Sequence, residues 1–328
     1  MLILGFESSC DDTAAAVVEN GTRVLSSVVS SQIKVHAEYG GVVPELASRE
    51  HIRNIRTVYE TAMKEADVRL DDIDRIGVTA GPGLLGALLV GLSFAKALSF
   101  GRNIPLIPVN HIECHIQSAF IEFGERIRFP AAAFVVSGGH THLLEMAPDR
   151  SLRLLCRTRD DAVGEAFDKL SKMLGLGYPG GPVIDRLAGE GDPKRYRLPR
   201  PRMSDGSDDM SFSGIKTAVF RLIREEDDNL DIPGLAASFQ KTVADILIDR
   251  IHRYEAESEF ASVILAGGVS ANSYIRSRFR DAFGDRTFIP SMAYATDNAA
   301  MVASYAYERR NDSPAPLHQE AFATWIPS

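Results

Sequence analysis

Two histidines four residues apart, His111 and His115, are the sharpest chemical feature of the sequence. On a helix this spacing puts both imidazoles on one face, where they can share a metal ion. The glutamate between them stands at the third position of HIECH, so the HExxH pattern of zinc proteases is absent. The alternative is a pair of ordinary helix histidines, one packed and one solvated. Cys114 is either a further soft ligand or a core residue.

A metal site with two histidines also needs a carboxylate from elsewhere in the chain, and it would then suit Fe(II) or Zn(II) acting as a Lewis acid. Asp297, beside Thr296, is the candidate, although a carboxylate at an apparent helix start is also the ordinary N-cap. The turn ESSCDDT (7–13) adds Asp11 and Asp12. Their carboxylates either orient a metal, a water or a ribose, or merely stabilise the turn.

Two glycine turns offer backbone groups that can approach a ligand. SGGH (137–140) combines two glycines with a serine hydroxyl and an imidazole, and such turns often cradle phosphate or carboxylate oxygens. AGGVSAN (266–272) joins a strand end to a helix start, where a purine nucleotide can lie against backbone. A packing turn is the alternative for the second motif.

A basic run, KRYRLPRPR at 194–202, stands out against a net charge of -8. Its prolines prevent a helix, and its arginines are Arg195, Arg197, Arg200 and Arg202. Such a run is usually only a solvated face. Against an acidic background, an extended arginine-rich loop is also a candidate for contact with a nucleic-acid phosphate backbone.

The elements that must position these residues alternate as in an α/β protein. Asn20-Gly21 marks a hairpin, apolar residues including Ile52 and Ile55 recur at helical spacing, and residues 190–214 show no sustained period. Strands are predicted at 2–6, 14–19, 23–31, 75–80, 105–109, 131–147 (a pair) and 262–266, and helices at 44–66, 84–100, 111–122, 233–257 and 297–310.

The opening hairpin and the strand pair at 131–147 share one design, an apolar strand, a small polar turn and a returning strand. This repetition suggests duplicated halves that face each other across a central cleft. The predicted fold is α/β, of the two-lobed actin/Hsp70/sugar-kinase (ASKHA) ATPase-like type. Residues 1–129 plus 297–328 form the predicted N-terminal lobe, and residues 130–296 form the C-terminal lobe.

The composition, 45% hydrophobic and 24% charged, is typical of a globular protein with real cores. The three scattered cysteines suit free thiols in a reducing cytosol, and MLILGFESSC has too short an apolar run for a signal peptide. The apolar stretch 83–100 is interrupted by Lys96, which favours a buried helix over a membrane span. A cytoplasmic enzyme without a membrane partner is expected.

A series of motifs, in order and over nearly the whole chain, resembles that of the TsaD family, and PELASREH with HIxxH resembles its bacterial branch. Asp12 stands where the family commonly has Glu, and Cys114, where Gly is frequent, would place a thiol beside the metal. The motifs are ESSCDDT, SQIKVHAEYGGVVPELASREH (31–51), TAGPGLLGALLVG (79–91), HIECH, VSGGHT, GEAFDK (164–169), GYPGGP (177–182), SFSGIKT (211–217), AGGVSAN and TDNAAM.

The resemblance implies a tRNA N6-adenosine threonylcarbamoyltransferase. This acyltransferase moves the threonylcarbamoyl group from threonylcarbamoyl-adenylate to the exocyclic amine of adenosine 37 in tRNAs that read ANN codons, and AMP leaves. A separate synthase supplies the adenylate, and the paralogue TsaB and the ATPase TsaE are the implied partners. The resemblance also implies one divalent metal ion on His111, His115 and Asp297, with Fe(2+) favoured and Zn(2+) as the alternative.

Contacts to the adenylate, an ATP-type nucleotide in the cleft, are implied for a set of residues in the second half of the chain. They are Val135, Val136, Ser137, Gly138, Gly139, Asp168, Gly181, Asp185 and Asn272.

The donor is an activated mixed anhydride, so positioning and charge stabilisation should dominate the chemistry. Asp11 is the candidate base or orienter for the proton that the attacking amine loses. The loop 194–202 is the first choice for contact with tRNA. Two other interpretations compete: a small-molecule kinase of the same superfamily, using Asp11 and the glycine turns with Mg-ATP, and a non-catalytic scaffold that resembles TsaB.

Overall fold

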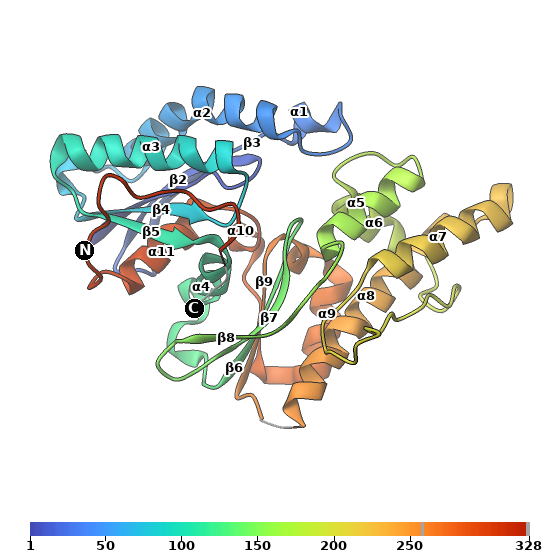
Figure 1. Ribbon diagram of the computed structural model, residues 1–328. Coiled ribbons are helices and arrows are strands. Elements are labelled where there is room, and N and C mark those ends of the chain that lie inside the picture. Colours follow the sequence, from blue (N-terminus) through green and yellow to red (C-terminus); the bar gives the residue numbers. More distant parts are fainter. Residues whose placement is uncertain (257–258, 326–328) are drawn as a thin grey trace. The chain divides into compact units, whose positions relative to one another are not determined.

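The computed structural model describes residues 1–256 and 259–325, so Glu257 of one predicted helix and residues 326–328 of the predicted first lobe lie outside it. The chain divides into two compact units. Unit 1 comprises Met1–Arg126 and Met292–Ser328, and unit 2 comprises Ile127–Ser291. Each unit is built on a five-stranded sheet with helices packed against it (Figure 1).

The sheet of unit 1 has the order β3-β2-β1-β4-β5. Its first three strands form an antiparallel meander, and β4 and β5 join it in parallel. Asn20 and Gly21 have φ angles of 52° and 76°, which confirms the hairpin predicted for this dipeptide. The strands are β1 (Leu2–Glu7), β2 (Asp12–Glu19), β3 (Arg23–Ser31), β4 (Arg75–Gly81) and β5 (Leu106–Asn110).

Helices cover both faces of this sheet (Figure 1). One face packs against α2 (Pro44–Glu65) and α3 (Leu85–Arg102), and Leu4 and Phe6 of β1 lie in that core. The other face packs against α11 (Ala299–Glu308), which also contacts α4 (His111–Phe123), and Ile3 lies in this second core. Because side chains alternate along a strand, β1 contributes to both cores. The short helices of unit 1 are α1 (Ile33–Ala37) and α10 (Met292–Ala295).

Two glycines allow α11 to lie directly on the sheet. A Cβ on Gly5 would stand 2.4 Å from the carbonyl oxygen of Ala299, and a Cβ on Gly77 would stand 2.6 Å from Cβ of Ala306. Neither position has room for a larger residue. The backbone of β1 and β4 therefore fixes the position of α11 and of the residues just before it.

The buried face of α2 differs from the prediction. Ile52 was expected among the apolar residues of that face, but its side chain is 65% exposed. The buried face instead carries Ala47, Ile55 and the polar residue His51. Periodicity alone could not show that a histidine replaces an aliphatic residue on the core side.

The predicted buried helix at 83–100 is buried on one face only. Leu88 and Leu92 of α3 are buried, whereas Leu89 and Phe100 are 47% and 75% exposed. By length and composition alone, α3 is the one helix among residues 1–256 and 259–325 that is long and apolar enough to cross a membrane. In the structure it packs against α2 and β4.

The sheet of unit 2 has the order β10-β9-β6-β7-β8 and repeats the arrangement of unit 1. Three antiparallel strands are again followed by two parallel ones, with β6 in the place of β1 and β9 in the place of β4. The duplicated halves of the predicted α/β fold are confirmed. The strands are β6 (Ala131–Val136), β7 (Thr141–Met146), β8 (Leu152–Arg157), β9 (Ser262–Ala266) and β10 (Thr287–Phe288).

The helices of unit 2 pack against this sheet in one continuous core. The sequence predicts α8 and the start of α9, whereas β8, α5, α6 and α7 were not predicted. The predicted loop 190–214 is confirmed as far as Phe212, where α7 follows. The helices are α5 (Val163–Met173), α6 (Gly180–Ala188), α7 (Ser213–Glu226), α8 (Ile232–Glu255) and α9 (Ser273–Phe283).

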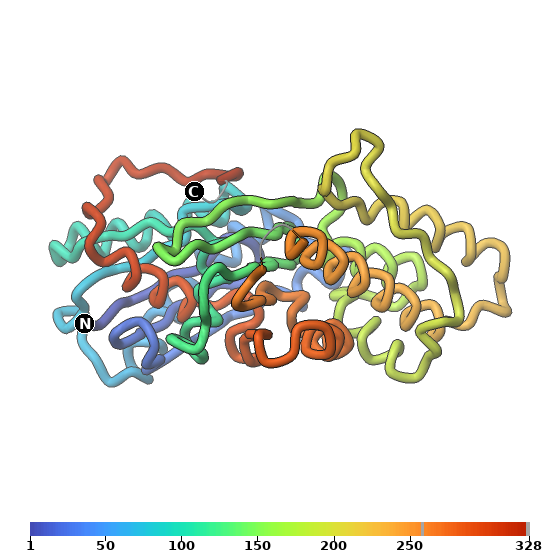
Figure 2. Tube along the Cα trace, turned by 90° about the horizontal axis from the view of Figure 1, so that it is seen from below, coloured from blue at the N-terminus to red at the C-terminus, as the bar shows by residue number. Residues whose placement is uncertain are grey.

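After α11 the chain runs back along unit 1 (Figure 2, dark red). The amide of Ala315 donates to the carbonyl of Leu106, and the amide of Phe322 donates to the carbonyl of Ala80 over 2.7 Å. This segment therefore lies against β4 and β5, the two strands that lead into α3 and α4.

Candidate metal centre and ligand-binding turns

The start of α4 is fixed by Asn110, the last residue of β5. Its side-chain oxygen accepts hydrogen bonds from the amides of Ile112 and Glu113, which makes it the N-cap. His111 is consequently the first helical residue, and His115 follows one turn later on the same face. Both histidines are buried.

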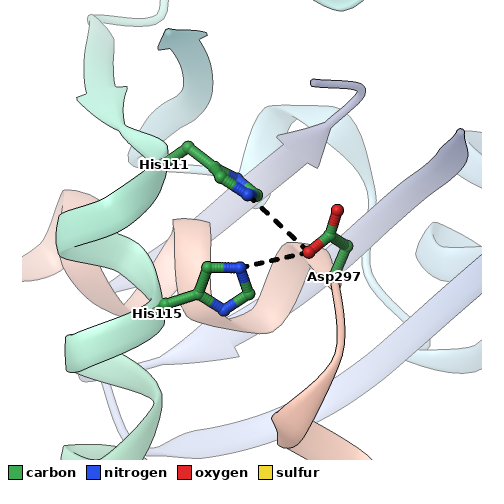
Figure 3. Close-up of side chains that lie close together, drawn as sticks. All are labelled: His111, His115 and Asp297. Atoms are coloured by element: carbon green, nitrogen blue, oxygen red, sulfur yellow. Dashed lines mark ion pairs between the residues drawn. The ribbon is translucent and has the colours of Figure 1, made fainter. Parts of the chain in front are cut away.

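The start of α11 separates two roles that the sequence could not distinguish. Asn298, and not Asp297, is the N-cap, because its side-chain oxygen accepts a hydrogen bond of 3.0 Å from the amide of Met301. The interpretation of Asp297 as an ordinary N-cap is therefore wrong. Its carboxylate points instead toward His111 and His115 (Figure 3).

The three side chains form a compact group. Oδ1 of Asp297 lies 3.1 Å from Nε2 of His115 and 3.7 Å from Nε2 of His111, and the ligand atoms of all three lie within 4.8 Å of one another. Ligands that bind one ion at about 2.0–2.2 Å stand roughly 3–4 Å apart. Both ring nitrogens of His115 are buried without a hydrogen bond to a described residue, since the contact of Nε2 with Asp297 lacks hydrogen-bond geometry. A divalent cation fits this donor set and would satisfy one of those nitrogens.

Glu7, at the end of β1, is the residue of this centre that sequence analysis missed, although it opens the quoted motif ESSCDDT. It is fully buried, and its Oε2 lies 3.0 Å from Nδ1 of His111. Burial is the largest single influence and raises the pKa of Glu7 and lowers that of His111, but the attraction between the two groups, together with the hydrogen bond from Thr79 to Glu7 and the charge of Asp297 beside His111, reverses both shifts. The pKa of Glu7 is lowered, and the pKa of His111 is raised to about 9, with a contribution from Asp297.

Cys114 belongs to the apolar core and not to the metal group. It is fully buried in the cluster between the sheet and α11, and it is absent from the group formed by His111, His115 and Asp297. Burial raises the pKa of its thiol well above the usual value, so the thiolate needed for a soft ligand is disfavoured. The expectation of a thiol at the metal is not supported.

The turn after β1 carries Asp11 and Asp12. Burial is the main cause that raises the pKa of Asp11, and it raises the pKa of Asp12 to about 7; the charge of Asp297 adds to both effects. Two motif residues brace the turn: the amide of Gln32 donates to the carbonyl of Asp11, and Nε2 of His51 lies 3.0 Å from the carbonyl of Cys10. The motif at 31–51 thereby holds the turn that bears the acids.

In unit 2 the residues expected to contact the adenylate begin at the end of β6. Val135 and Val136 are fully buried within that strand, and their backbone pairs with His142 and Thr141 of β7 and, at Val135, with Ala266 of β9, so the strand itself offers no free side chain to a ligand. The turn that follows contains Gly138 and Gly139, and no other atom lies within 4 Å of a Cβ placed on either. Gly164, near the start of α5, packs against the carbonyl of Ser137. This turn therefore presents open backbone beside a helix start.

Three of the other predicted contact residues of unit 2, Asp168, Asp185 and Asn272, form hydrogen bonds at the start of a helix. Oδ1 of Asp168 accepts a hydrogen bond of 2.7 Å from the amide of Gly180, which ties α5 to α6. The carboxylate of Asp185 accepts bonds from the amide and hydroxyl of Ser273, which ties α6 to α9. Asn272 is the N-cap of α9. Beside Asp168, Gly181 has open space at its Cβ position.

The four loop arginines differ in their contacts. Arg200 pairs with the buried carboxylate of Asp245, and Arg195 lies over the ring of its neighbour Tyr196. Arg197 and Arg202 are exposed, and neither forms an ion pair with a described residue. Arg197 and Arg200 line a cavity of about 620 Å³ together with Pro193, Lys194, Tyr196, Leu198, Pro199, Lys241 and Thr242.

Comparison with known proteins gives one consistent family. The model of the TsaD family, tRNA N6-adenosine threonylcarbamoyltransferase, matches residues 23–304. Relatives with that name include a protein of Geobacter sp., which is 51% identical over 92% of this chain and 90% of the relative's length. A second, from Geotalea daltonii, is 48% identical with the same coverage. The relative from Syntrophobacter fumaroxidans is 47% identical over 99% of this chain and 100% of its own.

Solved structures support the fold. HypF from T. kodakarensis matches with a TM-score of 0.61 and 14% identity, over 94% of this chain and 47% of its own. The ROK hexokinase of Thermus thermophilus matches with a TM-score of 0.51 and 14% identity, over 95% of this chain and 100% of its own. Together with the repeated sheets, these similarities establish the ASKHA ATPase-like fold.

Proposed function

Since the chain belongs to the TsaD family of tRNA N6-adenosine threonylcarbamoyltransferases, we propose that it transfers the threonylcarbamoyl group of threonylcarbamoyl-adenylate to the exocyclic amine of adenosine 37 in tRNAs that read ANN codons. AMP leaves in this reaction. The observation that carries the proposal is identity of about half the residues over nine tenths of both chains. The chain is accordingly a transferase that modifies tRNA.

His111, His115 and Asp297 are the proposed ligands of one divalent metal ion, Fe(2+) or Zn(2+). Support comes from the short separations of their donor atoms and from the buried, unbonded nitrogens of His115. When bound, such an ion supplies Lewis acidity that polarises the carbonyl of the donor. Two nitrogens and one oxygen suit either metal.

Asp11 is the proposed base or orienter for the attacking amine. Its carboxyl lies on a turn that His51 and Gln32 hold in place, and burial raises its pKa toward the range useful for proton transfer. Asp12, whose pKa is raised to about 7, is the nearest competitor. Single-turnover transfer by Asp11→Asn and Asp12→Asn, with bound donor, distinguishes them: near-normal transfer by Asp11→Asn would exclude Asp11.

The adenylate is proposed to bind unit 2 at the turn after β6 and at the starts of α6 and α9. Open backbone at Gly138, Gly139 and Gly181 lets a nucleotide approach closely, and helix starts favour anions. Asp168, Asp185 and Asn272 have local structural partners, so they hold these helix starts as well as offering contacts. Gly181→Ala, which adds a Cβ at this open position, should weaken the binding of AMP measured by calorimetry. Gly206→Asn, in the loop, is the control and should leave AMP binding unchanged.

The loop 194–202 is proposed to contact the tRNA backbone. Because Arg200 is committed to Asp245, the informative substitutions are Arg197→Glu and Arg202→Glu. Each lost phosphate contact should lower the slope of log affinity against log salt by about 1. Arg221→Glu, on the exposed side of α7, is the control and should bind tRNA as the unchanged protein does. Binding unaltered at several salt concentrations would exclude this loop.

TsaB, TsaE and a separate synthase that makes the adenylate are the proposed partners, and the cytoplasm is the proposed location. The family resemblance supports all four proposals, and the net charge of -8 supports a need for help in binding a polyanion. Omitting each partner in turn from a reconstituted reaction tests which of them is required.

One reconstitution tests the proposed activity. The protein is combined with its proposed partners, threonine, bicarbonate, ATP and unmodified tRNA, and the nucleosides are examined by mass spectrometry. Threonylcarbamoyladenosine should form, and His115→Ala should abolish it. His252→Ala, an exposed histidine of α8 that pairs with Glu255, is the matched control and should retain activity. If the unchanged protein forms no product while sugars are phosphorylated, the kinase interpretation replaces this one.

A further inference from the structure

Glu7 occupies a position that its charge makes costly. Its carboxylate has no solvent exposure, and a buried carboxylate is stable only if it is paired and hydrogen-bonded. Both oxygens accept hydrogen bonds. Oε1 accepts one of 2.6 Å from the amide of Ser9, and Oε2 accepts one of 2.6 Å from the hydroxyl of Thr79. Oε2 also faces Nδ1 of His111 at 3.0 Å. The carboxylate is thus held by the turn after β1 and by β4, and it cannot rotate without breaking these bonds.

This arrangement decides which nitrogen of His111 is available. The hydroxyl of Ser9 also lies 3.3 Å from Nδ1 of His111, but the carboxylate oxygen of Glu7 at 3.0 Å can only accept a hydrogen bond, so Nδ1 carries the proton that it donates to Glu7. In the neutral imidazole, which is the form that binds a metal ion, the lone pair is then left to Nε2, the nitrogen that faces Asp297. The other histidine differs, because Nδ1 of His115 has no hydrogen-bond partner among the described residues.

We propose that Glu7 is a positioning residue that orients His111, keeps its Nδ1 protonated and leaves Nε2 as the nitrogen that binds the metal. The inference rests on the proposed metal site. Carboxylates in this relation to a metal-bound histidine typically change metal affinity by roughly 10–100-fold when they are removed. Glu7 therefore sets the strength of the site without touching the ion.

Glu7→Gln separates this role from simple packing. If the amide oxygen of glutamine faces Ser9, its NH2 group meets Nδ1 of His111, which must then accept, and the proton moves to Nε2. If the amide is turned around, its NH2 group meets the N–H of Ser9, and two donors oppose each other. Neither orientation of the amide satisfies all the partners that the carboxylate satisfies.

The experiment measures the dissociation constant of Zn(2+) by competition with a chelator, for the whole chain and its variants. Glu7→Gln should weaken zinc binding by roughly 10–100-fold. The matched control is Glu113→Gln, a second buried glutamate, which lies on α4 between the two histidines and accepts a hydrogen bond from Tyr305. This control should bind zinc within about threefold of the unchanged chain.

Nitrogen NMR of the zinc-loaded proteins gives a second readout. His111 should show a protonated Nδ1 and a metal-bound Nε2 in the unchanged chain, and this pattern should be lost in Glu7→Gln. If Glu7→Gln does not fold, Thr79→Val takes its place, because it removes one bond that orients Glu7, and it should show an intermediate loss of affinity. Equal zinc affinity for a folded Glu7→Gln or Thr79→Val protein overturns the inference. Absence of zinc binding by the unchanged chain instead overturns the proposed metal site.

Discussion

Residues of one chemical type have opposite environments in this protein. The imidazole of His111 faces the carboxylate of Glu7, and its pKa is raised to about 9. The imidazole of His142 on β7 is partly buried beside Arg157, and burial together with that positive charge lowers its pKa to about 4. The surroundings, and not the residue type, decide whether a histidine carries charge at neutral pH.

His142 should make the stability of the folded protein depend on pH. Its folded pKa of about 4 lies below the unfolded value near 6.5, so the unfolded state binds more protons in this window. Stability is therefore lost as pH falls from 6.5 toward 4. His142→Gln should remove about 2 kcal/mol of this loss at pH 5 and almost none at pH 7.5, as measured by urea unfolding. If His142→Gln leaves the difference in unfolding free energy between pH 5 and pH 7.5 unchanged, the lowered pKa of His142 is contradicted.

The sequence predicts the individual ligands better than their surroundings. The spacing of His111 and His115 indicates one helix face, and the family motifs indicate Asp297. Glu7 gives no such signal, because its role depends on a contact between residues 104 positions apart. Nor could the sequence place Cys114, since core and ligand positions can alternate within one helical turn.

At the level of elements, the start of α11 divides two functions between adjacent residues. Asn298 caps the helix, and Asp297 faces the histidines. Asn298→Ala should cost about 1 kcal/mol of stability in urea unfolding and leave zinc affinity within about threefold. Asp297→Asn should show the reverse, with little loss of stability in the absence of metal and a large loss of zinc affinity. The opposite pattern would restore the capping role to Asp297.

The close contact between α11 and the sheet makes a second prediction. Gly5→Ala places a methyl group 2.4 Å from the carbonyl oxygen of Ala299, so α11 must move away from β1. We expect a loss of about 1–3 kcal/mol in urea unfolding, together with weaker zinc binding, because Asp297 moves with α11. Gly101→Ala, where nothing lies within 4 Å, is the control and should stabilise α3 by up to about 1 kcal/mol. Equal stability of both variants would refute the tight packing.

Element types followed from periodicity where the elements are long, as in α2, α4 and α8. The start of α11 was predicted two residues early, because two polar residues in succession both suit a cap. The segments α5 and α6 were recognised only as family motifs. Their glycines serve close packing, as at Gly180 against the carbonyl of Phe167, and this need is not visible in a hydrophobic pattern.

At the scale of the whole molecule, the duplicated sheets were predicted from a weak repeat in the sequence, namely two hairpins with small polar turns. This repeat indicated the fold class, and the strand orders of the two units confirm the duplication. The path of the last segment could not be predicted, since residues 312–325 form no helix or strand and have no period. Its backbone bonds to Leu106 and Ala80 arise only after β4 and β5 have formed.

Removing residues 315–328 should therefore destabilise unit 1 selectively. The chain loses the bonds to β4 and β5, as well as the bond from Asn110 to the carbonyl of Trp325. Amide hydrogen exchange should become faster in β4, β5 and the first turn of α4, and it should remain unchanged in β6 and β9 of unit 2. Uniformly faster exchange in both units would instead indicate global unfolding.

The order of the chain also determines when the centre can be completed. The ribosome releases His111 and His115 before any part of unit 2, and Asp297 only after all of it. A nascent chain therefore carries the two imidazoles without Asp297 while the 181 residues at 116–296 are made, at roughly 5–20 residues per second. If the proposed metal ion binds here, the full set of three ligands is available only after translation has passed the second unit.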